Sequence, residues 1–483
     1  MPPRIVVVGA GIAGLAAALR IAEEAGRVDL MVCEAGSRPG GVIATERAGE
    51  RGEYLVEAGP DSFLTEKPEA LLLCERLGIA DRLIGVQRDA RRIYVVHRGR
   101  LVPIPEGFRL VAPTRLVPWL RSPLFSWPGK LRMAMDYVLP RGRPEVDESV
   151  ASFVIRRLGR EAFDRVAQPM IGTIYTADAS TLSLAATMPR LAEMERRYGS
   201  VIRGFSRARP AGRDLAEGPG SGRRLGIFAT PSDGMQALVD AAVARLPAGT
   251  LRLRTEVIAV TRARDGARYS VGLAGGPALD ADAVVIAVDG PAAVRLLDNL
   301  DRGLASRLHE ISYASSASVT LAYRRSEIRH PLDGAGFVVP SVERRPILAA
   351  SFSSVKFAGR APADRALIRA FLGGALAPEV AGLDDDRLVA VVRAEMEALV
   401  GAAAAPHLVR VTRHRDAMPQ YRVGHLERVA GIEGAVGIHP GLALAGAAYR
   451  GIGISDCVKS GDAAAQHVLA SLAARRNLRA QGA

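Results

Sequence analysis

The run RIVVVGAGIAGLAAALRIAEEAGRVDLMVCE, residues 4–34, decides the fold. It predicts a buried strand at Arg4–Val8, a glycine turn, a helix at Leu15–Glu24 and a second strand at Val28–Cys33, which leads into Glu34. Strand, glycine turn, helix, strand and acid in this order form the fingerprint of a dinucleotide-binding unit. A secretory signal peptide is the alternative interpretation of the first apolar run. The placement of the glycines between a strand and a helix favours the dinucleotide-binding unit.

Each conspicuous residue of this unit has a physical role. Gly9 permits a tight turn, Gly11 lets the backbone approach a pyrophosphate, and Gly14 lets the helix pack closely on the strand. The free N–H groups at the start of the helix favour a negatively charged ligand. Glu34 can accept hydrogen bonds from both ribose hydroxyls and would repel a 2′-phosphate. The unit therefore predicts a dinucleotide that lacks this phosphate.

Three further glycine-rich segments could contact the same ligand. Arg38, Gly40 and Gly41 follow Glu34 and place a cation and bare backbone near a pyrophosphate or an isoalloxazine ring. Residues 56–62 form another turn after a short strand. Near the end of the chain, the turn 446–457 begins with Gly446 and precedes a predicted helix at Val458–Ala473, where it could close over the other end of an extended cofactor.

Composition sets broad limits on the protein. The chain has 483 residues, of which 48% are hydrophobic and 24% charged, so it can form a real core and about two to four lobes. It contains no charge-free apolar stretch of the ~18 residues that a membrane-spanning helix needs. Three distant cysteines, Cys33, Cys74 and Cys457, predict no metal site and fit a reducing compartment. The net charge of +13 is spread among acids, so we expect no nucleic-acid partner.

The middle of the chain allows two interpretations. Residues 106–139 mix arginines and apolar residues with both tryptophans, Trp119 and Trp127. Such a segment can lie in a membrane interface, or it can form a helical lobe with tryptophans in its core. Further helices are predicted at Val150–Leu158, Glu161–Ile171 and Leu184–Tyr198, and residues 203–224 are predicted to form a loop.

Several stretches resemble one enzyme family. Glu34 to Gly41 and Glu57 to Pro60 resemble the flavin-binding pattern of the amine-oxidase and porphyrinogen-oxidase superfamily. Further stretches along the whole chain resemble the oxygen-dependent protoporphyrinogen oxidases. These stretches are Val56–Leu64, Asp147–Ser149, Ile174–Asp178, Leu182 with Ser183, Pro419–Tyr421 with Gly424 and His425, and Leu444–Cys457.

The resemblance implies an α/β fold with three parts. A discontinuous Rossmann-like FAD-binding domain is expected at 1–88, 245–300 and 411–483. A mixed α+β substrate domain is expected at 89–104, 205–244 and 301–410, and a helical membrane-binding domain at 105–204. The last of these favours the membrane interpretation of Trp119 and Trp127.

The resemblance also implies the site residues. FAD is expected to bind non-covalently and to contact Gly9, Ala10, Gly11, Ile12, Ala13, Gly14, Glu34, Ala35, Val42, Gly59, Pro60, Asp61, Ser62, Val257, Ile452, Gly453 and Ile454. The glycine-rich segments described above add Arg38, Gly40, Gly41 and Gly446 to these expected contacts. The substrate is expected to contact Arg92, Thr173, Ala335, Val338, Ser351 and Phe371. Arg92 would hold a carboxylate, and Phe371 would pack on a pyrrole ring. Thr173, Ala335 and Ser351 depart from the residues common in the family, so the pocket wall is altered.

The activity implied is the FAD-dependent oxidation of protoporphyrinogen IX to protoporphyrin IX in haem synthesis, with O₂ as acceptor and H₂O₂ as product. Coproporphyrinogen III oxidase, flavin amine oxidase and a flavin-binding protein without turnover are the alternatives. No catalytic residue and no metal ligand are assigned, because N5 of the flavin carries the chemistry. We expect a cytoplasmic protein with peripheral contact at the inner face of the cell membrane, which could form a homodimer.

Overall fold

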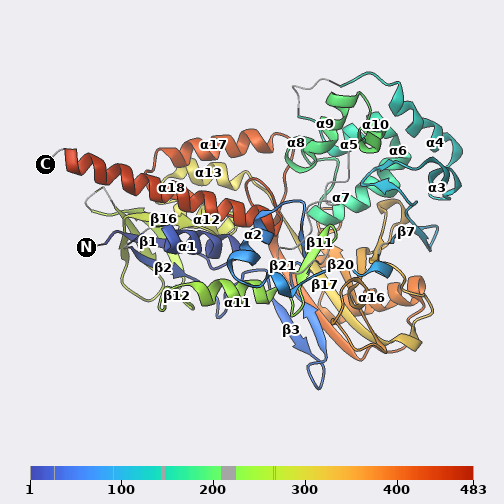
Figure 1. Cartoon of the computed structure of the whole chain (residues 1–483), viewed down its shortest axis with the longest axis horizontal. Helices are drawn as coiled ribbons and strands as arrows, with labels where there is room; N and C mark the ends of the chain where they lie inside the picture. The colour runs from blue at the N-terminus through green and yellow to red at the C-terminus, as the bar shows by residue number, and fades with distance from the viewer. Residues whose placement is uncertain are drawn as a thin grey trace.

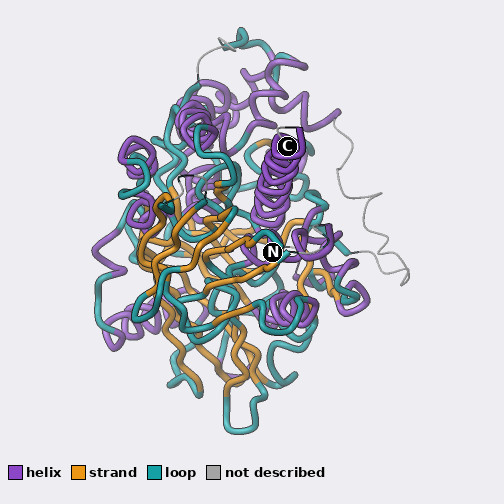
Figure 2. Tube along the Cα trace, turned by 90° about the vertical axis from the view of Figure 1, so that its left-hand side faces the viewer, coloured by secondary structure: helices purple, strands orange, loops and turns teal. Residues whose placement is uncertain are grey.

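The computed structural model describes residues 2–24, 26, 28–90, 92–142, 147–207, 225–264, 266 and 268–481. Strands gather in the middle of the molecule with helices around them (Figure 2). The two ends of the chain lie at the same end of the molecule (Figure 1). This arrangement is a mixed α/β fold, as the sequence predicts.

A five-stranded parallel sheet forms the first lobe, and its strands come from the beginning, middle and end of the chain. Their order is β12 (Leu251–Arg252), β2 (Asp29–Cys33), β1 (Arg4–Val8), β16 (Ala283–Ile286) and β22 (Leu442–Leu444). The predicted strand at Arg4–Val8 is confirmed, and so is the discontinuous Rossmann-like lobe.

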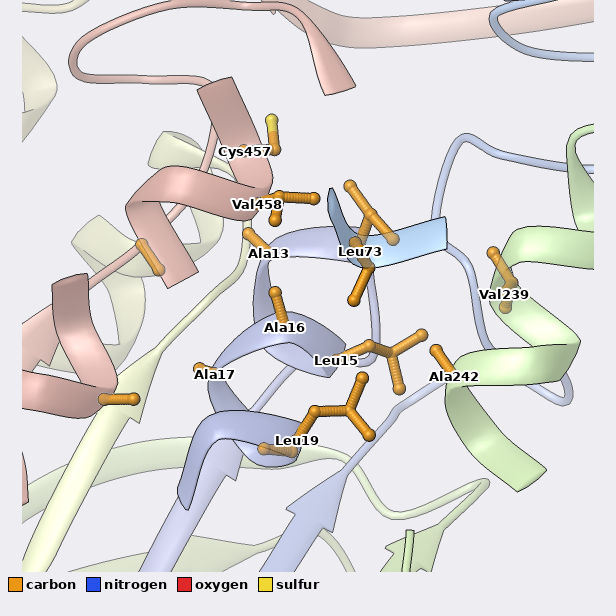
Figure 3. Packing of buried hydrophobic residues seen from close by; sticks show 14 of the residues in the cluster. Ala13, Leu15, Ala16, Ala17, Leu19, Leu73, Val239, Ala242, Cys457 and Val458 are labelled. Atoms are coloured by element: carbon orange, nitrogen blue, oxygen red, sulfur yellow. The ribbon is translucent and has the colours of Figure 1, made fainter. Parts of the chain in front are cut away.

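Small residues bring two helices close together on one face of this sheet. α1 (Ile12–Glu24) packs against α18 (Ile454–Gln481), where a Cβ on Gly461 would lie 2.2 Å from the carbonyl oxygen of Ala13. Figure 3 shows the alanines of α1 facing α18, and Leu15 and Leu19 facing α11 (Gln236–Arg245). α2 (Glu69–Arg76) completes this cluster.

The other face of the sheet carries its own buried cluster. Its helices are α12 (Gly290–Leu297), α13 (Arg302–His309) and α17 (His425–Gly437), and its strands are β13 (Val257–Arg262), β14 (Tyr269–Leu273) and β15 (Leu279–Ala281). Two smaller sheets extend the lobe: β3 (Thr45–Ala48) with β4 (Tyr54–Glu57), and β11 (Phe228–Pro231) between β5 (Phe63–Leu64) and β6 (Leu83–Gly85).

A seven-stranded sheet forms the second lobe. Its order is β21 (Leu408–Pro419), β17 (Tyr313–Arg324), β20 (Arg365–Gly373), β19 (Ile347–Phe352), β18 (Gly336–Val338), β7 (Ile93–His97) and β8 (Arg100–Pro103). α16 (Asp385–Val400) covers one face of this sheet, and α14 (Ser353–Lys356) and α15 (Pro378–Ala381) contact β20. The other face packs against the third lobe.

The third lobe is helical. It contains α3 (Leu116–Arg121), α4 (Trp127–Ala134), α5 (Val150–Leu158), α6 (Arg160–Ala162), a π-turn at Phe163–Ala167, α7 (Gln168–Tyr175), α8 (Leu184–Thr187), α9 (Pro189–Tyr198) and α10 (Val201–Arg207), with a short ribbon of β9 (Phe108–Arg109) and β10 (Ala112–Pro113). Inside this lobe, Arg157 and Asp136 form an ion pair, and both side chains are fully buried. No helix among the described residues is long and apolar enough to cross a bilayer.

Several predicted boundaries differ from the structure. The predicted helix at Leu184–Tyr198 is interrupted because Pro189 starts a new helix, a position that proline favours. The predicted loop 203–224 is helical up to Arg207, and the rest of it lies outside the described residues. α11, expected in the substrate domain, packs on α1, and the boundary expected at residue 410 falls inside β21.

The two tryptophans have different environments. Trp119 is buried in the core of the helical lobe, with 6% of its surface exposed. Trp127 begins α4, and 69% of its surface is exposed. Trp119 therefore fits the interpretation of a helical lobe with a tryptophan in its core, and Trp127 fits that of a membrane interface.

Candidate functional site

The N-terminal glycine turn, residues 9–14, leaves room for a ligand on one side only. A Cβ on Gly14 would lie 2.0 Å from the carbonyl oxygen of Gly9, and a Cβ on Gly9 would lie 2.6 Å from that of Ala287. A Cβ on Gly11 would meet no atom within 4 Å. The turn is therefore closed toward the protein and open beside the start of α1, where a pyrophosphate is favoured.

Glu34 is fixed at the end of β2. Its carboxylate accepts hydrogen bonds from the backbone N–H groups of Ala10 and Gly36, both at 2.8 Å. Its carbonyl accepts from Thr255, which lies just before Val257 and β13. The structure therefore brings Glu34 and Val257 together at the place expected for a ribose.

The loop 36–43 lies beside this turn. The N–H of Gly40 donates to the carbonyl of Ala10 at 2.8 Å, and Gly41 lies against Gly11. Arg38 donates to the carbonyls of Gly41 and Ile43, at 2.7 and 2.8 Å. Arg38 therefore shapes its own loop, whereas the sequence suggests a cation for the pyrophosphate. Val42 at the end of the loop is half exposed, as an apolar contact for a flat ring would be.

Gly59 packs against this loop so closely that only glycine fits. A Cβ at this position would lie 1.8 Å from the carbonyl oxygen of Val42. The buried side chain of Arg369 donates to the carbonyls of Gly59 and Ala58, at 2.5 and 2.6 Å, and to the hydroxyl of Ser318. Arg369 therefore holds the loop 58–62 in place, a role that the sequence analysis did not predict.

An ion pair fixes the other end of the loop 58–62. Lys356 donates to the carboxylate of Asp61 at 2.8 Å, and Ser62 donates to the same group. Burial by itself raises the pKa of Asp61, but Lys356, Ser62 and Arg369 together outweigh it and hold the pKa below its usual value. Asp61 is therefore ionised and its loop is tied to α14.

The C-terminal glycine turn, residues 446–453, is held by Tyr421. The Tyr421 hydroxyl donates to the carbonyl of Ala447 at 2.6 Å and accepts from the N–H of Gly451 at 2.8 Å. Ile452 packs against the core of the helical lobe, and Ile454 starts α18. This turn therefore lies where the dinucleotide lobe meets the helical lobe.

His425 supports Tyr421 from behind. The two rings are stacked with centroids 3.8 Å apart, and Nε2 of His425 donates to the carbonyl of Tyr449 at 2.8 Å. Burial lowers the pKa of His425 to about 4. The segment from Pro419 to His425, which resembles the family most specifically, thus has a structural role beneath the glycine turn.

Acidification is expected to destabilise the protein through His425. In the unfolded chain this histidine has the ordinary pKa of about 6.5, whereas burial in the folded protein lowers its pKa to about 4. The contribution of His425 to the free energy of unfolding is therefore complete above pH 6.5 and is lost as the pH falls toward 4. The loss amounts to roughly 3 kcal/mol. We expect the free energy of unfolding of the wild type to fall more steeply between pH 7 and 5 than that of His425→Gln. Parallel pH profiles for the two proteins would contradict this assignment.

The predicted substrate residues meet on one face of the seven-stranded sheet. Val95 pairs with Val338, Val338 with Ala349, and Ala349 with Phe371, so these four residues form one row across four strands. We call this row the apolar strip. It faces the helical lobe, where α7 carries Thr173, and it joins the same buried cluster as Ile452.

The next row of the same face leads to the loop 58–62. It contains Ile93, Gly336, Ser351 and Arg369, each two residues from a member of the apolar strip. Ser351 therefore lies between the strip and the loop 58–62, which Arg369 contacts. Ala335 is tied to β19 through its backbone, because its carbonyl accepts a hydrogen bond from the N–H of Phe352 at 2.9 Å.

Arg92 is the predicted substrate residue that the structure does not bring to this face. Its guanidinium pairs with Asp333 at 2.5 Å, and the hydroxyl of Tyr94 donates to the same carboxylate. Tyr94 belongs to the cluster on the opposite face of the sheet, whereas Ile93 shares the face of the apolar strip. Arg92 is therefore already paired with a carboxylate of the protein, on the side of the sheet away from the apolar strip.

Comparison with known proteins identifies the family of the chain. The family of flavin-containing amine oxidoreductases matches residues 12–469. The chain is 36% identical to coproporphyrinogen III oxidase of Propionibacterium freudenreichii (97% of this chain, 92% of the relative) and 32% identical to that of Bacillus subtilis (97% and 98%). It is 31% identical to the chloroplastic protoporphyrinogen oxidase of Nicotiana tabacum (94% and 83%). A crystal structure from Exiguobacterium sp. 255-15 superposes with a TM-score of 0.86 at 28% identity (97% and 99%).

Proposed function

The chain belongs to the flavin-containing amine oxidoreductases, and we propose that it is an FAD-dependent oxidase that converts a porphyrinogen to the corresponding porphyrin. The observation that carries this proposal is the apolar strip beside the loops 36–43 and 58–62, the proposed flavin loops, since the apolar faces of the pyrrole rings can pack on such a surface. Coproporphyrinogen III is the preferred substrate, because the relatives with 36% and 32% identity are named coproporphyrinogen III oxidases. Protoporphyrinogen IX is the second candidate, supported by the tobacco relative.

The residues present fit FAD as a non-covalent cofactor. Glu34 suits the ribose, the N-terminal glycine turn suits the pyrophosphate, and the loops 36–43 and 58–62 with the C-terminal glycine turn suit the ring system. Cys457, which follows the C-terminal glycine turn, is buried beside Val458 and Ala13 (Figure 3). Burial raises the pKa of its thiol to about 12, so we do not assign it a covalent bond to the cofactor.

The protein's contribution to the reaction is positioning. A bound flavin supplies a hydride acceptor at N5, and O₂ is the proposed final acceptor, giving H₂O₂. The partly exposed side chains of Phe371 and Thr173 contact the macrocycle where the otherwise buried apolar strip meets the helical lobe, and they exclude water from its face. Arg369 and Gly59 fix the ring end of the cofactor site, so that it stays aligned with the strip.

Anaerobic mixing of the purified holoenzyme with each porphyrinogen tests the proposal. We expect coproporphyrinogen III to bleach the flavin absorbance within a catalytic turnover, and porphyrin fluorescence to appear under air. Bleaching by a primary amine but by neither porphyrinogen would make the protein an amine oxidase. Unchanged absorbance with every reductant would make it a flavin-binding protein without turnover.

Exposed apolar residues on the helical lobe support a second proposal, peripheral contact with a membrane. They lie on α3, α4 and the turn that follows, and they are Leu116, Val117, Trp127, Leu131, Met135, Tyr137 and Val138, each between 42% and 79% exposed. The formal net charge of +13 favours an anionic surface, although Lys130 beneath the Trp127 ring is itself buried. Such a surface suits the interface of an anionic bilayer.

Removing two of these side chains is expected to weaken vesicle binding. Burial of a large apolar side chain contributes about 1.5–3 kcal/mol, so Trp127→Ser with Leu131→Ser should lower the partition onto phosphatidylglycerol vesicles at least tenfold. Sedimentation with the vesicles measures this. Ile438→Ser is the control, because Ile438 is 69% exposed like Trp127 but lies on the dinucleotide lobe. An equal loss for both proteins would contradict the proposed surface.

A further inference from the structure

A cavity of about 210 Å³ lies where the apolar strip ends. α7 forms one wall with Gln168 and Thr173, and the turn from β18 to β19 forms the other with Ser341 and Arg344. Its lining begins at Val339, directly after Val338, and includes Gly373, two residues after Phe371. The cavity therefore continues the predicted substrate surface on the side away from the flavin loops.

Arg344 is the charged residue of this cavity that lacks an ionic partner. Arg345 pairs with Glu395 at 2.9 Å, and Glu343 accepts hydrogen bonds from the backbone N–H groups of Arg98 and Gly99. Within the described residues, Arg344 has no carboxylate within 4.0 Å. A guanidinium that the protein does not neutralise, at the edge of a cavity, favours a carboxylate ligand.

The backbone of Arg344 adds an independent observation. Its φ is +52°, in the left-handed region that residues other than glycine and asparagine seldom adopt. Its N–H donates to the carbonyl of Ser341, which ends the short turn before β19. This turn holds Arg344 beside the cavity.

The distance along the sheet suits a tetrapyrrole. On β20, Arg369 contacts the loop 58–62 and Gly373 lines the cavity, four residues further, which is about 13 Å at ~3.3 Å per residue. A macrocycle packed on Phe371 with one edge at the flavin would turn its opposite edge toward Arg344. Coproporphyrinogen III has a propionate on every pyrrole ring, whereas protoporphyrinogen IX has propionates on two rings and vinyl groups on the others.

We propose that Arg344 binds a propionate at the edge of the substrate remote from the flavin and thereby selects a porphyrinogen with a carboxylate on all four rings. The macrocycle must present different meso carbons to the flavin during its successive oxidations. A tetracarboxylate offers Arg344 a partner in each of these orientations, and a dicarboxylate does so only in some. This inference rests on the proposed function and specifies its substrate.

Arg344→Asn tests the proposal without adding backbone strain, because asparagine tolerates the left-handed conformation. Loss of one charged hydrogen bond predicts a rise of about tenfold or more in the KM for coproporphyrinogen III and in the Kd for coproporphyrin III, measured by absorbance titration. The same constants for protoporphyrinogen IX and protoporphyrin IX are expected to change less than threefold. The flavin content and the Tm are expected to stay at the wild-type level.

Two further variants complete the experiment. Arg98→Asn is the matched control, because Arg98 also has a φ of +52° but lies outside the lining of this cavity. Arg92→Ala tests the alternative carboxylate site beside Asp333. Unchanged constants in Arg344→Asn, equal changes for both substrates, or the same selective loss in Arg98→Asn or Arg92→Ala would overturn the proposal. A wild type that oxidises neither porphyrinogen would refute the proposed function, whereas the porphyrin titrations would still report on Arg344.

Discussion

Gly59→Ala is expected to be purified without flavin. The new Cβ would lie 1.8 Å from the carbonyl oxygen of Val42 and 2.8 Å from its carbon, so the loops 36–43 and 58–62 would have to separate. Forcing extra volume into such a contact costs about 1–3 kcal/mol or more. This corresponds to roughly tenfold to hundredfold weaker FAD binding. The ratio of flavin to protein absorbance and an FAD titration of the apoprotein measure the effect.

Gly434→Ala is the matched control for this substitution. Gly434 lies inside α17, and a Cβ there would meet no atom within 4 Å. Alanine at this position should keep full flavin content and add slight stability, because it favours a helix more than glycine does. FAD affinity within threefold of the wild type in Gly59→Ala would show that the two loops do not form the cofactor site.

The parts of the site that the sequence predicted are those encoded by local patterns. Gly9, Gly14 and Glu34 lie within one βαβ unit; Gly14 and Glu34 act through neighbours in that unit, whereas Gly9 packs on Ala287. Their roles follow from the turn, the close helix packing and the position of an acid at a strand end. The first strand and the start of the cofactor site could therefore be derived without any knowledge of distant contacts.

Contacts across long stretches of chain could not be derived in this way. Arg369 meets Gly59 across 310 residues, and a fully charged side chain in the middle of a strand suggests solvent exposure rather than burial. Arg92 shows a second limit. Successive residues of a strand face opposite sides of a sheet, so a difference of one position between Arg92 and Ile93 decides which of them reaches the apolar strip.

Arg369→Met is expected to release the flavin while the protein stays folded. The substitution keeps an apolar stem but removes the donor that now lies 2.5 Å from the carbonyl of Gly59 and 2.6 Å from that of Ala58. The carbonyl of Ala58 keeps its contact with Nε2 of His414 at 3.0 Å, whereas that of Gly59 loses its donor. A buried carbonyl left unpaired costs about 1–3 kcal/mol, and the loop 58–62 can avoid this cost by moving toward water. Because this loop packs against Val42, its movement should open the ring end of the cofactor site, and FAD affinity is expected to fall about tenfold or more.

Arg369→Lys and Arg365→Met separate positioning from charge. A lysine retains the positive charge beside Asp61 but cannot donate to two carbonyls and Ser318 in one plane, so it should restore only part of the FAD affinity. Arg365 lies on the same strand and pairs with Asp364 at 3.4 Å, away from the loop, so Arg365→Met should bind FAD normally. If lysine restored the affinity completely, the charge of Arg369 would hold the loop. If Arg365→Met lost as much affinity as Arg369→Met, the effect would belong to the strand and not to the contact with Gly59.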